Sequence, residues 1–339
     1  MTAFAKIIDI AGYLPKNTLT NEDLGGLYSG WSAEKIFEKT GIHTRHIASN
    51  VETASDLAFQ AALNLFRQGK VKAADIDFLI FCSQAPDYIL PTTACLLQNR
   101  LGIPTVAGAL DINLGCSGYV YSLSLAKGLI ESGAANNVLV LTADTYSKYI
   151  NPLDKSVRTL FGDGACATIV ASTPGDKSFI GPFVFGTDGR GAKNLIIEGG
   201  GFRTPFSDKT SQEHEDESGN IRSANNLYMN GAEVMSFSLK EVPRSVEALL
   251  TKAQTTKESI DYFVLHQANR FMLQALRKKL KLSEEKLPIH IENCGNTVSS
   301  SIPFALLEMR KQGNFDTEKK MMLVGFGVGY SWAACILYL

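Results

Sequence analysis

The chain has 339 residues, 45% of them hydrophobic, and its 33 basic and 34 acidic side chains leave a formal net charge of -1. This length allows a large buried core made of two domains or two fused halves. The balanced charge argues against nucleic acid or an anionic membrane surface as a partner.

The cysteines and the N-terminal residues indicate a cellular compartment. Six cysteines are scattered along the chain without a CxxC pair, a pattern that fits neither a metal site nor the dense disulfides of small secreted domains. The first residues lack the basic and apolar regions of a signal peptide, and no apolar run is long enough to cross a bilayer. The sequence therefore predicts a reduced, soluble, cytoplasmic protein that does not bind membranes.

Strands and helices alternate along the first half of the chain. Continuous apolar runs indicate buried strands, and apolar residues at three-to-four spacing indicate helices. The expected strands cover 4–13, 75–83, 109–113 and 136–144, and the expected helices cover 53–69, 92–101 and 118–133. This alternation predicts an α/β fold, with 109–113 as a short buried strand.

The same strand–helix–strand order returns in the second half. The apolar segment that ends at Cys82 resembles the one that ends at His266. The glycine-led helical segment over 115–133 resembles 295–313, and an apolar strand follows each. Chance similarity between α/β segments is the alternative, but matched spacing over three elements favours a true repeat.

The repeat predicts two pseudo-equivalent halves, 1–175 and 176–339. It places Cys116 and Asn296 at equivalent points, each just after a glycine where a helix is expected. Within the second half, the segment over 206–226 is rich in charge, Ser and Asn, and is expected to be an exposed excursion.

Cys116 is the candidate nucleophile. Unpaired N–H groups and the positive end of the dipole at a helix start favour thiolate over thiol, which makes a cysteine more nucleophilic. An inert buried cysteine is the alternative. The Gly-Cys-Ser-Gly turn distinguishes Cys116 from four cysteines in apolar runs that are interpreted as packing residues, namely Cys82, Cys95, Cys166 and Cys335.

His266 and Asn296 are the candidate partners of Cys116. His266 ends a buried strand and precedes a polar turn, at the edge of a sheet where active sites of α/β proteins are usually built. A neutral amide such as that of Asn296 can stabilise an oxyanion without titrating. The alternatives are a structural histidine and an asparagine that caps a helix.

Five motifs then occur in one order: GCSG at 115–118, FGDGA at 161–165, HQAN at 266–269, GNT at 295–297 and a glycine run ending at 332. Together, and nearly end to end, the chain resembles the 3-oxoacyl-[acyl-carrier-protein] synthase III family of the thiolase superfamily. The resemblance implies a five-layered α/β/α/β/α arrangement. It also implies a homodimer built across 107–113.

The resemblance implies a decarboxylating Claisen condensation. Cys116 would take an acyl group from acyl-CoA or an acyl carrier protein. Malonyl-carrier protein would then lose carbon dioxide, and His266 and Asn296 would stabilise the enolate that attacks the acyl group. Backbone N–H groups of Cys116 and Val328 would hold the oxyanion. No cofactor is implied beyond the phosphopantetheine that the substrates carry.

Further site residues follow from the same resemblance. Lys35, Lys39 and Lys155 match positions at which relatives grip CoA with Trp and Arg, and Asn269 and Arg270 also belong to the entrance. Lysine keeps the positive charge but loses aromatic stacking and the bidentate fork, which suggests weaker recognition of CoA.

Two positions depart from the family pattern near the acyl chain and the oxyanion. Leu90 falls where many relatives have a phenylalanine that caps the acyl pocket of the neighbouring subunit, so we expect it to admit a longer or branched chain. Val328 replaces the central glycine of the family's glycine run, and its side chain restricts the backbone that would hold the oxyanion.

Other activities of the same fold remain as alternatives. The acyl group could pass from Cys116 to an alcohol or amine, although Asn296 argues against such a simple transfer. Hydroxymethylglutaryl-CoA synthase and thiolase are disfavoured because their further catalytic glutamate or cysteine has no matching motif. A non-catalytic subunit that binds acyl carrier protein is disfavoured because all three catalytic residues are retained.

Overall fold

Two β-sheets organise the molecule, which a computed structural model describes over residues 3–314 and 318–339. The first sheet has five strands in the order β1-β7-β6-β4-β5, and the second has four in the order β13-β14-β15-β8. The first comprises β1 (Ala3–Tyr13), β4 (Phe78–Cys82), β5 (Gly108–Ile112), β6 (Asn137–Asp144) and β7 (Gly164–Pro174). The second comprises β8 (Ile180–Thr187), β13 (Tyr262–Leu265), β14 (Lys320–Gly327) and β15 (Ser331–Tyr338).

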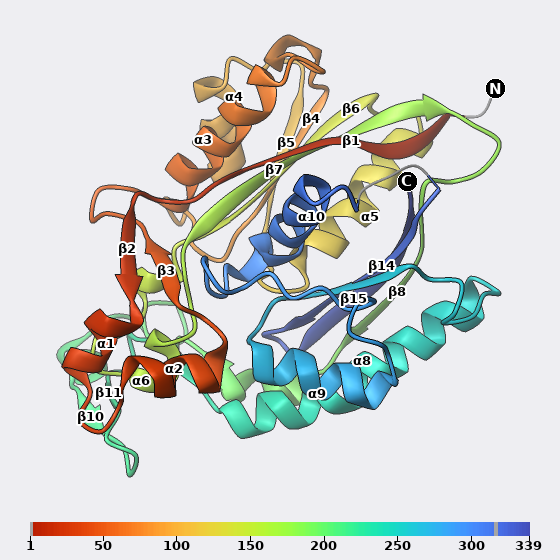
Figure 1. Ribbon diagram of the computed structural model, residues 1–339. Helices are drawn as coiled ribbons and strands as arrows, with labels where there is room; N and C mark the ends of the chain where they lie inside the picture. Colours follow the sequence, from red (N-terminus) through yellow and green to blue (C-terminus); the bar gives the residue numbers. More distant parts are fainter. Residues whose placement is uncertain (1–2, 315–317) are drawn as a thin grey trace.

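Helices fill the space between the sheets and cover their outer faces (Figure 1). The central pair is α5 (Gly118–Glu131) and α10 (Ser301–Lys311), and each contacts strands of both sheets. The outer helices are α3 (Ala54–Arg67) and α4 (Thr93–Arg100) on the first sheet, and α8 (Gly231–Lys252) and α9 (Arg270–Leu280) beside the second. The predicted five-layered α/β/α/β/α arrangement is confirmed.

The remaining elements are short and lie mostly around the lower left of Figure 1. The helices are α1 (Asn21–Leu27), α2 (Ala33–Thr40), α6 (Lys155–Arg158) and α7 (Asp208–Ser211). The strands are β2 (Asn17–Thr20), β3 (Thr44–Ile47), β9 (Leu195–Ile196), β10 (His214–Glu215), β11 (Ile221–Arg222) and β12 (Tyr228–Met229). Short 3-10 helices are η1 (Ala73–Asp75), η2 (Tyr146–Lys148), η3 (Gly189–Asn194) and η4 (Val298–Ser300).

The two sheets repeat one topology. The order β1-β7-β6-β4 in the first sheet matches β8-β15-β14-β13 in the second, and the central helices α5 and α10 precede the corresponding strands β6 and β14. Only β5 has no counterpart among the strands described. The predicted boundary at 175/176 falls between β7 and β8, and the division into halves remains an interpretation of the repeat.

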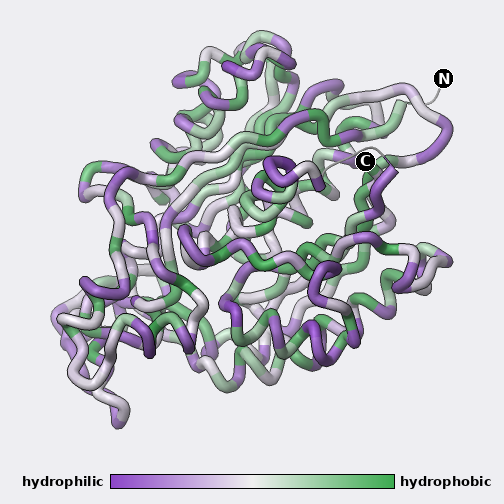
Figure 2. Tube along the Cα trace, viewed as in Figure 1, coloured by the Kyte–Doolittle hydropathy of each residue, from purple (hydrophilic) through white to green (hydrophobic). Residues whose placement is uncertain are grey.

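Local sequence explains how the elements form, as α3 illustrates. Thr53 and Asp56 exchange side-chain and backbone hydrogen bonds in a capping box at its start. Its apolar residues at three-to-four spacing are buried against β1, β7 and β6. The hydropathic colouring shows the same pattern in the whole molecule, with apolar residues concentrated in the sheets and central helices (Figure 2).

Strand β5 differs from the prediction, because all five of its residues are only half-buried. The expected fully buried strand was wrong because β5 lies at the edge of its sheet and pairs with β4 alone. Three apolar side chains before it are exposed, Ile89 at 82%, Leu90 at 79% and Val106 at 94%. The edge of the first sheet is therefore both open and apolar.

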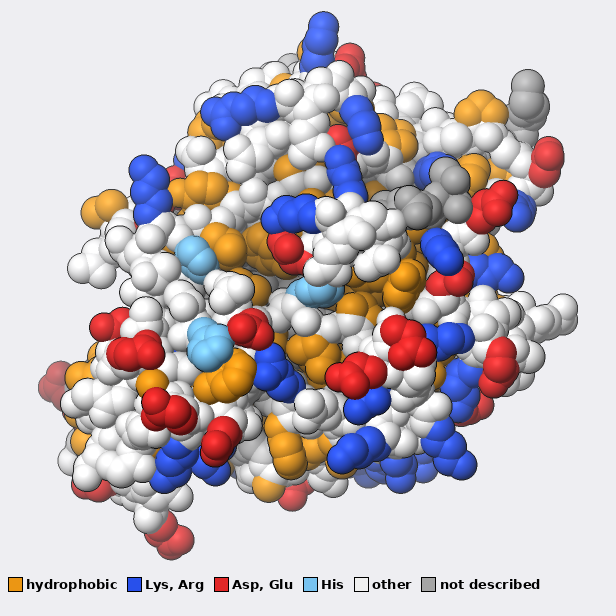
Figure 3. Space-filling model, viewed as in Figure 1, with side chains coloured by type: hydrophobic (Ala, Val, Ile, Leu, Met, Phe, Trp, Pro, Cys, Tyr) orange, Lys and Arg blue, Asp and Glu red, His pale blue; other side chains and the backbone are white. Residues whose placement is uncertain are grey.

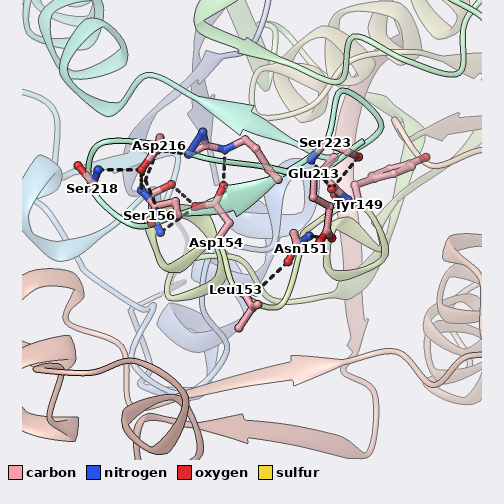
Figure 4. A network of polar contacts seen from close by, with 12 residues as sticks. Tyr149, Asn151, Leu153, Asp154, Ser156, Glu213, Asp216, Ser218 and Ser223 are labelled. Atoms are coloured by element: carbon pink, nitrogen blue, oxygen red, sulfur yellow. Dashed lines mark hydrogen bonds and ion pairs between the residues drawn. The ribbon is translucent and has the colours of Figure 1, made fainter. Parts of the chain in front are cut away.

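The segment over 206–226 is mostly exposed, yet a polar network ties it to residues 149–156 (Figure 4). Arg222 donates to Asp154 at 2.7 Å and to Asp216 at 2.5 Å. Asn151 donates to Glu213 at 2.6 Å. Because Asp154 is fully buried, its pairing with Arg222 fixes the segment on the body of the protein.

Within the described residues, no helix combines the length and apolar character needed to cross a membrane. Cys82, Cys166 and Cys335 are buried, as expected of packing residues, but Cys95 is exposed. The interpretation of Cys95 was wrong because it lies on the outer face of α4, opposite the buried Ala94 and Leu97.

Candidate active site

A cavity of about 70 Å³ lies where the two halves meet, and it brings together Cys116, His266 and Asn296. The three residues come from the turn before α5, the end of β13 and the turn before α10. The rest of the lining is largely apolar and includes Leu195, Met229, Val234, Met272 and Phe326. Polar groups in such surroundings interact strongly because little water screens them.

Cys116 lies in the turn that connects β5 to α5, two residues before the helix begins at Gly118. The expectation that the helix begins at Cys116 was therefore wrong by two residues, since it begins at Gly118. A side chain at Gly327 would place its Cβ 2.9 Å from the Cys116 sulfur, which explains why a glycine faces the thiol there.

The thiol of Cys116 is not depressed in pKa as its sequence position suggested. Burial, with a smaller contribution from the nearby Asp144 carboxylate, raises the pKa of Cys116 to about 12. The backbone N–H groups of Cys116 and Val328 lie near the sulfur and lower its pKa, but the effect of burial is larger. The resting group is therefore a thiol, and two converging N–H groups are present where an anion would develop.

His266 follows the last residue of β13, and its own N–H donates to the carbonyl of Val324 on β14 at 2.8 Å. Its Nδ1 lies 2.6 Å from the hydroxyl of Ser301, the first residue of α10. The ring packs edge-on against Phe326, with ring centroids 5.6 Å apart. Sheet, helix and aromatic ring together fix the imidazole.

The hydrogen bonds of Ser301 favour one tautomer of His266, with the ring proton on Nε2. The Ser301 hydroxyl accepts from the N–H of Gln267 at 3.3 Å, so its single proton is available to donate to Nδ1 of His266. Nε2 then carries the ring proton. Burial lowers the pKa of His266 to about 3, which keeps the ring neutral and makes it a hydrogen-bond donor rather than an acid near neutral pH.

Asn296 is held by its backbone and by its own side-chain oxygen. Its N–H donates to Leu160 at 2.9 Å, and its carbonyl accepts from Gly162 at 3.0 Å. Its Oδ1 accepts from the N–H of Val298 at 2.9 Å, as in an Asx turn. The amide nitrogen, its donor end, is thus left for the cavity. Asn296 does not cap α10, because the N-cap is Ser300.

Asn269 and Arg270 flank the cavity at the start of α9. Asn269 lines it and caps the helix, accepting from the N–H of Met272 at 2.8 Å. Arg270 pairs with Glu292 at 2.9 Å and lies 4.8 Å above the ring of Phe37. Arg270 is thereby fixed between α9 and α2.

The three lysines expected at the entrance do not line this cavity in the described structure. Lys35 donates to the carbonyl of Gly30 at 2.7 Å, and Lys155 donates to the carbonyl of Ser218. Lys35 and Lys39 lie 5.3 and 5.7 Å from the ring of Trp31. Trp31 thus places an aromatic ring beside two of the lysines, and the expected weaker recognition of CoA remains a prediction.

The backbone N–H of Val328 lies near the Cys116 sulfur and lowers its pKa, although the side chain of Val328 replaces the family's glycine. Its φ is not positive, so a side chain is tolerated. Leu90 is not among the described residues that line the cavity, and its side chain is exposed. Its expected role concerns a neighbouring subunit and remains a prediction.

The sequence did not predict the residues that position the catalytic side chains through hydrogen bonds. Ser301 contacts His266, and Asp144 at the end of β6 accepts bonds from Ser299, next to the Asn296 turn. The signal available was the run of three serines at 299–301 directly after Asn296, since hydroxyls beside a buried turn need partners.

Two repeated α/β halves with cysteine, histidine and asparagine in one cavity between them define a protein of the thiolase fold. Comparison with known families narrows this class. The models "3-Oxoacyl-[acyl-carrier-protein (ACP)] synthase III" and its C-terminal counterpart match residues 110–189 and 250–339. The chain belongs to the 3-oxoacyl-[acyl-carrier-protein] synthase III family.

Curated relatives and solved structures agree with this assignment. The chain is 36% identical to a beta-ketoacyl-[acyl-carrier-protein] synthase III of Caldanaerobacter subterraneus, over 98% of this chain and 97% of the relative. A crystal structure of a 3-oxoacyl-(acyl-carrier-protein) synthase III is 63% identical with a TM-score of 0.98, over 99% and 100% of the two chains. A crystal structure of a 3-oxoacyl-(acyl-carrier protein) synthase from Burkholderia xenovorans is 38% identical with a TM-score of 0.90, over 99% of this chain and 94% of the other.

Proposed function

We propose that this protein is an acyltransferase that condenses an acyl thioester with a malonyl-carrier protein, with loss of carbon dioxide, to give a 3-oxoacyl-carrier protein. The observation that carries the proposal is the convergence of Cys116, His266 and Asn296 on one apolar cavity. A nucleophile and two neutral donors suit a reaction that develops negative charge twice on thioester oxygens.

In the first half-reaction, the sulfur of Cys116 attacks the carbonyl carbon of the acyl thioester. The thiol proton ends on the departing phosphopantetheine thiol, so no net charge is left in the cavity. The N–H groups of Cys116 and Val328, which lie near the sulfur, stabilise the tetrahedral oxyanion. Removing one such donor typically slows an enzyme about a hundredfold or more.

In the second half-reaction, the malonyl thioester loses its carboxylate as carbon dioxide, and the electron pair of the broken C–C bond becomes an enolate. Nε2–H of His266 and the amide nitrogen of Asn296 donate to the enolate oxygen. Neutral donors suit this step, because an imidazolium would protonate the carbanion carbon. Burial favours the neutral imidazole by lowering the pKa of His266.

The enolate carbon then attacks the acyl carbonyl on Cys116. A C–C bond forms, the C–S bond to Cys116 breaks, and the thiolate takes a proton. The 3-oxoacyl thioester leaves on its carrier. Phosphopantetheine attached to the substrates is the only prosthetic group that this sequence of steps uses.

The protein is also proposed to bind acyl-CoA more weakly than relatives that have arginine at the entrance. Supporting this, the ammonium groups of Lys35 and Lys155 already donate to backbone carbonyls. A carrier-protein donor would instead meet the Lys and Arg side chains that gather over α8 and α9 at the lower right of Figure 3. A low Michaelis constant for acyl-CoA, compared with acyl-carrier protein, would refute this preference.

We also propose a homodimer formed across β5. The open edge of β5 and the exposed Ile89, Leu90 and Val106 support it, since unpaired edges and apolar patches are usually covered. Leu90 would then reach the acyl pocket of the partner subunit. Sedimentation equilibrium tests the dimer, and a monomer at micromolar concentration would exclude it.

Steady-state condensation assays test the proposed reaction. Purified protein is supplied with malonyl-carrier protein and a panel of acyl-CoA and acyl-carrier donors, and products are identified by mass. We expect a 3-oxoacyl-carrier protein with wild-type protein and none with Cys116→Ala. Acylation of Cys116 without any condensed product would instead favour simple acyl transfer.

A further inference from the structure

The strongest unexplained feature near the site is a buried carboxylate that the proposed reaction does not use. Asp144 ends β6 and is completely buried. Its three hydrogen bonds come from uncharged donors, the N–H of Gln84 at 2.9 Å and the N–H and hydroxyl of Ser299 at 3.1 and 2.5 Å. Burying a charged group is costly, so such an arrangement calls for a reason.

Two of these three bonds reach across the molecule. Asp144 belongs to the first half of the chain, whereas Ser299 lies in η4 of the second half, three residues after Asn296. Ser300 repeats the connection, donating to the carbonyl of Thr142 on the same strand at 3.0 Å. The turn after Asn296 is therefore tied to β6 at two successive residues.

The tied turn contains a strained residue. Val298 has φ of +53°, a left-handed conformation that a β-branched side chain rarely adopts. Such a conformation persists only when neighbouring contacts impose it. Directly after Val298, the backbone N–H of Ser299 donates to Asp144. The side chain of Val298 is completely buried and packs towards Gly115 in the Cys116 turn.

The strained conformation has a consequence for Asn296. It directs the N–H of Val298 to Oδ1 of Asn296 at 2.9 Å. Because Oδ1 is occupied there, the amide nitrogen points away from the turn and is available to the cavity that Asn296 lines. Without the left-handed residue, nothing else among the described contacts sets the orientation of this amide.

We propose that Asp144 is a positioning residue for the condensation: through Ser299 it holds Val298 in its left-handed conformation, and so turns the donor end of Asn296 towards the substrate. This inference rests on the proposed function for its chemistry, but its geometric content stands on the contacts alone. Asp144 acts on the half-reaction that uses Asn296 and not on acylation of Cys116.

The test separates the two half-reactions in Ser299→Ala, Ser299→Thr and Asp144→Asn. Acylation is followed by intact-protein mass and decarboxylation by carbon dioxide release from malonyl-carrier protein. We expect Ser299→Ala to slow carbon dioxide release about tenfold, less than the hundredfold of losing a direct donor, with acylation changed by less than about threefold. Ser299→Thr keeps the hydroxyl and should recover most of the rate.

A matched control and a double variant exclude a general structural effect. Ser156 donates its N–H and hydroxyl to another buried carboxylate, Asp154, so Ser156→Ala removes the same kind of bond within the polar network of Figure 4 rather than beside Asn296, and should leave the ratio of the two rates unchanged. In an Asn296→Ala background, Ser299→Ala should slow carbon dioxide release no further, since its effect passes through Asn296.

Crystal structures give a readout that does not depend on activity. In Ser299→Ala we expect Val298 to leave its positive φ and the amide of Asn296 to rotate or take two orientations. The inference is overturned if both residues keep their conformations, or if Ser299→Ala slows the two half-reactions equally. A wild-type protein that releases no carbon dioxide would contradict the proposed function, while the crystal comparison would still judge the role of Asp144.

Discussion

The turns that carry Cys116 and Asn296 occupy equivalent positions in the two halves but are built differently. The chain passes from Cys116 directly into α5, with glycines at 115 and 118. From Asn296 it passes through the 3-10 turn η4, with Val298 in a left-handed conformation, before α10 begins. Both turns line the same cavity.

The difference follows from what each turn must present. A nucleophile needs N–H groups left free around it and little side-chain bulk, and side chains at Gly115 or Gly118 would collide with Gln84 or with the sulfur of Cys82. A donor amide must instead be fixed by its acceptor end, which uses the N–H of Val298. The serines at 299–301 then secure the backbone, each with a different partner. One scaffold thus gives an open turn and a tied turn.

Removing the nucleophile from the open turn should have the largest effect on condensation. In Cys116→Ala we expect condensation to fall on the order of a thousandfold or more, because no acyl-enzyme can form. Intact-protein mass after incubation with the acyl donor should show no adduct. An adduct of normal yield on this variant would mean that another residue is the nucleophile.

Removing the amide should divide the two half-reactions. In Asn296→Ala we expect carbon dioxide release to slow about a hundredfold or more, because the enolate loses one donor, while acylation of Cys116 changes by less than about threefold. Parallel stopped assays of both steps measure the split. Equal slowing of both steps would assign Asn296 to the fold rather than to the enolate.

Ser301 allows a finer test of the tied turn. In Ser301→Ala the Nδ1 of His266 loses its donor, so the ring proton is no longer held on Nε2. We expect carbon dioxide release to slow about tenfold, a loss of about 1.4 kcal/mol. Nitrogen NMR of labelled histidine should show the Nε2–H tautomer in wild type and a mixture in the variant. An unchanged tautomer would mean that Ser301 does not determine which nitrogen of His266 carries the proton.

The raised pKa of Cys116 and the lowered pKa of His266 predict a pH dependence. Because of these two shifts, Cys116 rests as a neutral thiol and His266 as a neutral imidazole between pH 5 and about 9. The thiolate fraction then rises about tenfold per pH unit up to about 12. Alkylation by iodoacetamide, followed by mass, should accelerate from pH 7 to 9 without a plateau. A plateau near pH 7 would indicate a thiolate–imidazolium pair instead.

The sequence predicts the layers and the three central residues because repeats and strand ends are local signals. Apolar runs mark β4 and β13, and glycines mark the two turns. The Asp144–Ser299 contact was beyond prediction, since 155 residues separate its partners. The pKa of Cys116 was predicted in the wrong direction because burial, which only packing reveals, outweighs the turn's N–H groups.

Peripheral residues were harder for the same reason. The partner of Lys155 is a carbonyl in the segment over 206–226, which the sequence suggested only as an exposed excursion. Trp31 lies two residues before α2, and Lys35 and Lys39 on that helix lie over its ring. Long-range polar pairing, rather than periodicity, decides the contact of Lys155.

A single-turnover experiment tests most directly whether one cavity performs both half-reactions. Protein acylated to completion is freed of donor, mixed with malonyl-carrier protein and quenched at short times, and the acyl group on Cys116, carbon dioxide and 3-oxoacyl-carrier protein are followed together. We predict that the adduct on Cys116 disappears at the rate at which carbon dioxide and the condensed product appear, in equal amounts. Product formed while the adduct on Cys116 persists would contradict the account.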